Sequence, residues 1–146
     1  VSKAVSSLVD EGYDVFGLYP NLSNIDEVKD AFEEVKNKYG KIDILVNNAG
    51  VSSATPFEKY TEEEYERVVD INIKAVCNCS KVAVDYLKEN GGVILNTSYM
   101  VSIYGQPSGV MYPASKYAVN GITKSLAREL GKYNLRVNQH CKGMIG

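Results

Sequence analysis

Tyr112 and Lys116, a tyrosine and a lysine four residues apart, are the pair in this sequence best suited to proton transfer. Residues at this spacing share one face of a helix, so a helix would bring the phenol and the ammonium together. A free tyrosine titrates at about 10, and a fixed cation nearby favours the phenolate and lowers that pKa. The pair is a candidate acid–base couple, although the same spacing also fits an exposed lysine beside a half-buried tyrosine.

The pair must be positioned by elements that alternate regularly along the chain. Short apolar runs predict strands, and apolar residues at three- and four-residue steps predict helices between them. We expect strands over 13–18, 42–46, 93–96 and from 135 to 138, and helices over 3–11, from Ser23 or Asn24 to Gly40, from Thr61 to Gly91 and from Tyr112 to Gly131. A loop over 102–109 should precede the Tyr112 helix. With no hairpin signal, this pattern predicts a three-layer α/β/α fold with a doubly wound, Rossmann-like parallel sheet.

Polar residues follow each predicted strand. They are Asn21, the run 47–50, the run 96–98 and the pair Lys142-Gly143. In parallel α/β sheets, ligands bind beyond the carboxyl ends of the strands, so these residues should meet at one edge. Any one of them could instead simply build a turn. Four at one edge, beside Tyr112 and Lys116, favour a cleft with chemistry.

Composition narrows the class of protein. The 146 residues are 45% hydrophobic and carry a net charge of -2, which suits one globular domain and gives no reason to expect nucleic acid or a membrane as partner. The three cysteines lack a CxxC spacing, so we expect buried free thiols in a reducing cytoplasm. We expect no metal site: the acidic run after Thr61 has the spacing of a helix start, and His140 stands alone. The first residue is Val1, which indicates a missing beginning.

Together, these motifs resemble those of the short-chain dehydrogenase/reductase family. The resemblance rests on residues 47–50, 70–73, 96–98, 112–116 and 136–138 and covers essentially all 146 residues. It implies that residues 1–146 are the central part of a single Rossmann-like domain that binds NAD or NADP. It also implies a small-molecule alcohol or ketone as substrate and a homo-oligomer, a dimer or a tetramer, as the parent enzyme.

The resemblance also implies roles for individual residues. Tyr112 would be the acid–base residue, while Lys116 would hold the nicotinamide ribose and lower the tyrosine pKa. Asn72, in the middle of the long helix, would position a water that links Lys116 to solvent. The residues expected along the cofactor are Asn21, Leu22, Asn48, Ala49, Gly50, Tyr112, Lys116 and Gly143.

Three departures from the family pattern stand out. The twelve glycines include no G-x-G-x-x-G set, so the first strands and the glycine-rich turn that would hold the pyrophosphate are missing. The position of the catalytic serine is Tyr99; Ser98 is adjacent, but neighbouring side chains on an extended backbone point to opposite sides. A polar run, Gln139 to Lys142, stands where small apolar residues and Pro-Gly are usual.

Two hypotheses follow. The first is an NAD(P)-dependent oxidoreductase that interconverts a secondary alcohol and a ketone, with Tyr112 as the acid–base group. Residues 16–23 and 109–116 resemble both the bile-acid 3α-hydroxysteroid dehydrogenases and the 3-oxoacyl-carrier-protein reductases of the family, so the substrate would be a hydroxysteroid or a 3-oxoacyl thioester. The alternative is a truncated, catalytically impaired relative that keeps only a subunit-association surface or a weak cofactor-binding surface.

Overall fold

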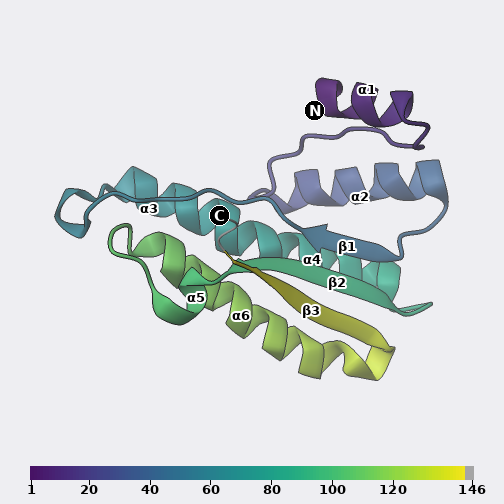
Figure 1. Cartoon of the computed structure of the whole chain (residues 1–146). Helices are drawn as coiled ribbons and strands as arrows, with labels where there is room; N and C mark the ends of the chain where they lie inside the picture. Colours follow the sequence, from purple (N-terminus) through teal and green to yellow (C-terminus); the bar gives the residue numbers. More distant parts are fainter. Residues whose placement is uncertain (144–146) are drawn as a thin grey trace.

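A computed structural model describes residues 1–143 of the chain. Its centre is a parallel sheet in the order β1 (Ile44–Asn47), β2 (Gly92–Tyr99) and β3 (Leu135–Lys142), shown in Figure 1. Ile44 pairs with Val93, and Gly92 pairs with Leu135. Because all three strands run in the same direction, their carboxyl ends lie at one edge of the sheet, as the alternating sequence pattern predicts.

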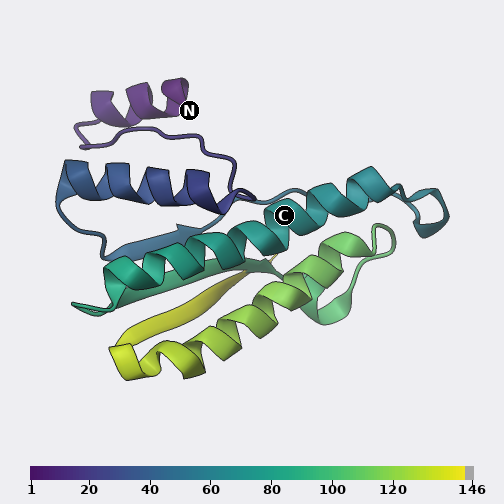
Figure 2. The ribbon, with the colours of Figure 1, turned by 180° about the vertical axis from the view of Figure 1, so that it is seen from behind.

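Two long helices cover one face of this sheet (Figure 2). They are α4 (Ala75–Leu87) and α6 (Met111–Leu130), and α2 (Ile25–Tyr39) packs beside α4. Helices lie on both sides of the three parallel strands, and the short α1 (Ser2–Asp10) begins the chain. The described residues therefore form part of a Rossmann-like α/β fold with a parallel sheet, as the sequence predicts.

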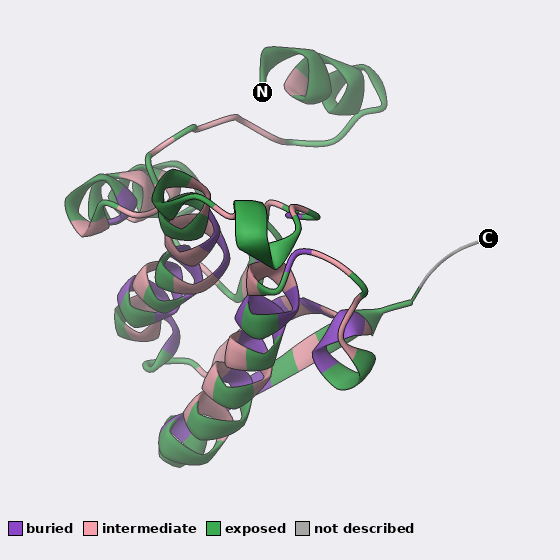
Figure 3. Cartoon of the chain, turned by 90° about the vertical axis from the view of Figure 1, so that its left-hand side faces the viewer, coloured by how far each residue is buried: buried purple, intermediate pink, exposed green. Residues whose placement is uncertain are grey.

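The core lies between the sheet and the two long helices, where Figure 3 places most of the buried residues. Its central cluster consists of Ala83, Leu87, Ile94, Leu130, Leu135 and Val137. Ile94, Leu135 and Val137 reach the same face because side chains alternate along a strand. Burying these apolar groups holds α4 and α6 against β2 and β3, which fixes the helix that carries Tyr112 and Lys116.

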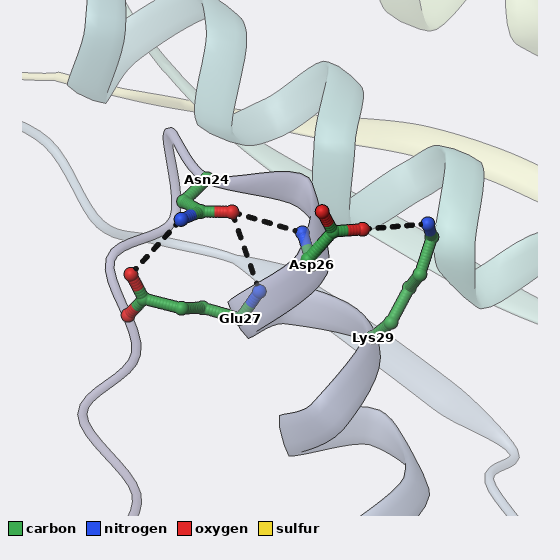
Figure 4. A network of polar contacts seen from close by, with 4 residues as sticks. All are labelled: Asn24, Asp26, Glu27 and Lys29. Carbon is green, nitrogen blue, oxygen red and sulfur yellow. Dashed lines mark hydrogen bonds and ion pairs between the residues drawn. The ribbon is translucent and has the colours of Figure 1, made fainter.

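The start of α2 is built by side chains that satisfy free backbone amides (Figure 4). The amide oxygen of Asn24 accepts hydrogen bonds from the backbone N–H of Asp26 and of Glu27, at 3.0 and 3.5 Å, and its Nδ2 donates to the Glu27 carboxylate at 3.1 Å. Lys29 pairs with Asp26 one turn further on. Of the two predicted caps, Asn24 is therefore the one that the structure uses.

Residues 13–18, predicted as a strand, are not one. Within residues 1–143 no strand lies beside this segment, and strand structure depends on backbone hydrogen bonds to a neighbour. The described sheet thus has three strands instead of four. The polar run Gln139 to Lys142, in contrast, continues β3, because it pairs with residues 96–99 of β2, and its polar side chains are tolerated because the run is largely exposed.

The long helix expected between Thr61 and Gly91 is divided. α3 (Glu62–Val69) is capped by Thr61, whose Oγ1 accepts from the backbone N–H of Glu64 at 3.2 Å. A π-helical turn, η2 (Asp70–Lys74), separates it from α4. Such turns are frequent at functional sites, and this one carries Asn72. The remaining short elements are the 3-10 turns η1 (Phe57–Lys59) and η3 (Gly131–Tyr133) and the helix α5 (Val101–Tyr104), which occupies part of the predicted loop.

The described residues contain no helix that is both long enough and apolar enough to cross a membrane. In this same part of the chain, no three histidine, cysteine or acidic side chains come together as ligands for a metal ion. All three cysteines are free thiols. The prediction that they are buried holds for Cys79 only, because Cys77 and Cys141 are exposed.

Candidate active site

Tyr112 and Lys116 lie in the first turns of α6, as the sequence predicts. The Lys116 ammonium nitrogen is 5.7 Å from the centre of the Tyr112 ring. Lys116 is buried, and its Nζ donates a hydrogen bond to the backbone carbonyl of Thr97, at the end of β2, at 3.0 Å. This bond ties the start of α6 to the carboxyl end of the sheet.

The pKa of Tyr112 is shifted in the opposite direction from our expectation. Burial raises the pKa of the Tyr112 phenol, and the neighbouring Tyr99 phenol raises it further. Burial also lowers the pKa of the Lys116 ammonium. The lysine does not offset the burial of the phenol because its Nζ is directed to the Thr97 carbonyl. At neutral pH Tyr112 is therefore a phenol, which can donate a proton.

Tyr99 and Ser98 point in different directions at the end of β2. The Tyr99 ring lies 6.2 Å from the Tyr112 ring, centre to centre, at an interplanar angle of 51°. Ser98 is fully buried, and its hydroxyl donates to the Asn120 side chain at 2.6 Å and approaches the Ser102 hydroxyl at 3.2 Å. Strand alternation thus places Tyr99, and not Ser98, against the Tyr112 phenol.

Asn72 links two segments of the site. Its side-chain oxygen accepts from the backbone N–H of Val51 at 2.8 Å. Its side-chain nitrogen donates to the Val51 carbonyl and to the Ser115 hydroxyl, both at 2.9 Å. Asn72 is almost fully buried. It clamps the segment after β1 to the helix of Tyr112.

A polar cavity of about 300 Å³ joins most of the predicted site residues. Thr97 donates a hydrogen bond from its hydroxyl to the Asn48 side chain at 3.0 Å. A Cβ at Gly50 would lie at ordinary van der Waals distance from the Asn72 oxygen and the Lys116 nitrogen, 3.4 and 3.7 Å, so only a larger side chain would occupy the space beside the lysine. The predicted residues lining the cavity are Asn48, Gly50, Ser98, Tyr99, Tyr112 and Lys116.

Other predicted residues lie elsewhere. Leu22 and Ala49 line a second cavity of about 210 Å³ between α2, β1 and α4, which Asn48 also borders. Asn21 lies in the turn before α2, where its side chain accepts from the backbone N–H and hydroxyl of Ser23. Gly143 follows β3 directly and is exposed. The polar cavity therefore joins residues from three of the four polar groups, and Asn21 is not among its lining residues.

Thr97 and Lys142, which the sequence places in the polar runs after two predicted strands, also line the polar cavity. Thr97 contributes its hydroxyl to Asn48 and its carbonyl to Lys116. Lys142 lines the cavity from the end of β3 and adds a second cation. Their position after a predicted strand is the signal that placed them at this edge. The lining residues that the motifs did not name are Val51 and Ser52, which continue the chain directly after Gly50.

Two loops beside the cavity, around residues 53–54 and 106–109, are joined by hydrogen bonds. The Gln106 side-chain nitrogen donates to the backbone carbonyls of Ser53, Ser108 and Gly109. Ser108 donates from its hydroxyl to the Ala54 carbonyl at 2.6 Å. Gly109 has φ +82°, and a Cβ there would overlap the Ser53 carbonyl. These contacts hold the loop that leads into α6.

The cavity fits the ribose and nicotinamide end of a nicotinamide cofactor. The Lys116 ammonium is held by one protein carbonyl and has further N–H donors for hydroxyl groups. Gly50 leaves room for a ligand beside the lysine, and the Thr97 and Asn48 side chains are polar. The sequence contains no glycine-rich turn of the kind that binds the pyrophosphate.

Comparisons with known proteins agree with this geometry. The family model described as short chain dehydrogenase matches residues 1–146. A 3alpha-hydroxysteroid dehydrogenase of Mediterraneibacter gnavus is 56% identical over 131 residues, covering 89% of this chain and 52% of the relative. A 3-oxoacyl-acyl-carrier-protein reductase of Thermotoga maritima is 41% identical over 126 residues, covering 86% of this chain and 51% of the relative.

Comparison with a solved structure agrees with these sequence relatives. A crystal structure of an NAD+-bound xylitol dehydrogenase superposes with a TM-score of 0.94 at 30% identity, covering 99% of this chain and 56% of the other. The chain thus spans about half the length of the curated relatives that it matches. The match to the family model over residues 1–146, with these relatives and this fold, shows that the chain belongs to the short-chain dehydrogenase/reductase family, whose members are oxidoreductases.

Proposed function

We propose that this chain takes part in hydride transfer between a nicotinamide cofactor, NAD or NADP, and a secondary alcohol or ketone. The observation that carries the proposal is the cavity in which the Tyr112 phenol, the buried Lys116 ammonium and Gly50 meet. The bound nicotinamide supplies or accepts the hydride. Tyr112 donates its hydroxyl proton to the carbonyl oxygen in the reduction and accepts that proton in the oxidation.

The other residues of the site support this step. Lys116, buried and tied to the Thr97 carbonyl, would hold the ribose hydroxyls of the cofactor. Asn48 and Gly50, which line the same cavity, and the adjacent Ala49 would lie along it, with Gly50 allowing its close approach. Asn72 holds the Val51 segment at a fixed position relative to α6, so that the cofactor and the Tyr112 phenol keep their positions relative to one another.

The named relatives support two substrate classes. The higher identity, 56%, is to a 3alpha-hydroxysteroid dehydrogenase, and the lower, 41%, is to a 3-oxoacyl-acyl-carrier-protein reductase. A hydroxysteroid is therefore our first proposal for the substrate, and a 3-oxoacyl thioester the second.

Cofactor titration of the chain tests the proposal. Addition of the chain to NADH or NADPH should change the fluorescence of the dihydronicotinamide, and Lys116→Met should weaken the effect at least tenfold. Lys124→Met, on the exposed side of α6, is the matched control and should bind as the unaltered chain does. Absence of binding at millimolar cofactor would refute the idea that these residues form a working nicotinamide site.

A second candidate is subunit association without turnover. An apolar groove of about 520 Å³ runs between α4 and α6 and is lined by Val84, Ile122, Leu126 and Leu130, among others. Tyr99, at the expected serine position, would suit a chain that has lost activity. Sedimentation velocity tests this alternative: Leu126→Glu should convert a dimer or tetramer to monomers, whereas a monomeric unaltered chain contradicts it.

A further inference from the structure

Tyr99 separates two cavities of different character. On one side lies the polar cavity of Tyr112 and Lys116, with a volume of about 300 Å³. On the other side lies a cavity of about 320 Å³, bordered by α5 and the loop after it. Tyr99 is the residue that lines both. Tyr99 is therefore a wall common to both cavities, and its ring is within reach of a molecule bound beside Tyr112.

The second cavity is lined mainly by apolar groups. Its lining residues are Tyr99, Met100, Val101, Tyr104, Gly105, Gln106 and Pro107. None of these described residues carries a charge, and Gln106 uses its side-chain nitrogen on the backbone of the neighbouring loop. Tyr104 is 78% exposed and stands at the opening. Two aromatic rings and a proline ring are surfaces on which flat, apolar ring systems pack well.

We propose that this apolar cavity binds the hydrocarbon body of the substrate and that Tyr99 selects a rigid, flat, apolar ketone or alcohol. The proposal rests on the proposed function and deepens it. The Tyr99 ring is 6.2 Å from the Tyr112 ring, so a ring system packed on Tyr99 has its edge beside the phenol that exchanges the proton. Tyr99 is here a specificity-determining residue, not a replacement for the serine hydroxyl.

The chemistry of the cavity discriminates between the two substrate classes. A fused ring system is already rigid and loses little conformational entropy on binding. A 3-oxoacyl thioester is flexible and carries polar amide groups along its arm, for which this cavity offers few partners. The Tyr99 ring should therefore contribute to the affinity for the rigid ketone much more than to the affinity for the thioester.

Binding to the chain tests the proposal without any need for turnover. The probes are an uncharged 3-oxo steroid and S-acetoacetyl-N-acetylcysteamine, and their dissociation constants are measured from NMR shifts in ¹³C-tyrosine-labelled protein. The steroid should bind at least about tenfold more tightly than the thioester. Tyr99→Ala should lose about tenfold in steroid affinity, and Tyr99→Phe, which keeps the ring, should restore most of it.

Two further variants keep the test decisive. Tyr104→Ala, at an exposed position that cannot upset the core, should also weaken steroid binding several-fold, even if Tyr99→Ala fails to fold. Tyr19→Ala is the matched control, because Tyr19 is exposed and lines neither cavity. Equal affinity for the two probes, no steroid binding, or steroid binding unaffected at both Tyr99 and Tyr104 overturns the proposal.

A turnover assay with NADH separates this proposal from the proposed function. Steroid binding that depends on Tyr99 but leads to no NADH oxidation contradicts the proposed function and leaves the apolar subsite standing. Oxidation of NADH with the thioester but not with the steroid contradicts the subsite and leaves the proposed function standing.

Discussion

The side-chain nitrogen of Asn72 donates a hydrogen bond to the Ser115 hydroxyl at 2.9 Å, across the gap between the π-helical turn and α6. With its two bonds to the Val51 backbone, Asn72 satisfies its amide inside the protein. Such a buried, fully bonded amide rigidifies its surroundings, and loss of one partner leaves the others unsatisfied.

Asn72→Ala should lower the free energy of unfolding by about 3 kcal/mol, because the Val51 N–H and C=O and the Ser115 hydroxyl lose a partner in a buried place. Urea denaturation measures the effect. Asn78→Ala is the matched control: Asn78 lies on the same long helical segment but donates a single, partly buried bond to the Leu22 carbonyl, so it should cost about 1 kcal/mol. Equal decreases in the free energy of unfolding for the two variants would contradict the proposed role of Asn72 in holding the Val51 segment to α6.

Gly109→Ala and Gly105→Ala form a second matched pair. Both glycines have positive φ, +82° and +72°, and Gly105, with ψ -166°, lies in a region adopted almost only by glycine, so alanine is strained at either position by about 1 to 3 kcal/mol. Only at Gly109 does the added Cβ overlap a neighbour, the Ser53 carbonyl. Gly109→Ala should therefore be the more destabilising of the two by at least about 1 kcal/mol in thermal or urea unfolding. A larger destabilisation by Gly105→Ala than by Gly109→Ala would show that the loop of Gly109 does not pack tightly against the loop of Ser53.

The Cys79 thiol should make stability depend on pH. Burial raises its pKa from 9.0 to about 11, so the neutral thiol is favoured in the folded state. The contribution to stability is fully present below pH 9 and is lost as the pH rises through 11, by roughly 2 kcal/mol. We expect the free energy of unfolding of Cys79→Ala to fall less between pH 8 and 11 than that of Cys141→Ala, in which an exposed thiol is removed.

Tyr112→Phe should abolish reduction of a ketone by NADH, with a loss of at least about 100-fold, because the proton donor is removed. Binding of NADH should persist, since Lys116 keeps its bond to Thr97. Steady-state rates and cofactor fluorescence measure the two effects. Retained turnover would remove Tyr112 from its proposed role.

The raised pKa of Tyr112 predicts the pH profile of that reaction. Below the raised pKa the phenol keeps its proton, so reduction should proceed at a constant rate through neutral pH and decline as the pH climbs past 10. Oxidation of the alcohol needs the phenolate and should accelerate over the same range. Tyr99→Phe removes one of the two causes that raise the pKa of Tyr112, so the pH profiles of both reduction and oxidation should move to lower pH. Profiles that do not move would contradict this coupling.

Local sequence patterns predicted most of the fold. Nearby residues determine the Asn24 and Thr61 caps, the first-turn position of Pro113 in α6 and the strands that follow Gly40, Gly91 and Gly131. All of these are found. The segment 13–18 was predicted wrongly because its apolar pattern suits a strand, whereas a strand requires a partner that no local pattern reveals. The π-helical turn has no sequence signature in hydrophobic periodicity.

The sequence predicted which residues line the polar cavity better than it predicted their pKa values. Alternation along β2 correctly placed Ser98 and Tyr99 on opposite sides. The direction of the Tyr112 pKa shift was missed, because it depends on where the Lys116 ammonium points and how deeply the phenol lies. Side-chain direction and burial are properties of the packed structure, and spacing in the sequence does not contain them.

The π-helical turn also sets a rotational phase. A π turn accommodates one extra residue while the flanking helices stay in phase, so a further residue inserted into Asp70–Lys74 would rotate α3 against α4 by about 100°. Glu64, whose carboxylate accepts a hydrogen bond from the Ser53 hydroxyl, would then turn away from the segment that follows Gly50. Substitutions along α3 change single contacts, whereas a length change in this turn would reset every contact of the helix at once.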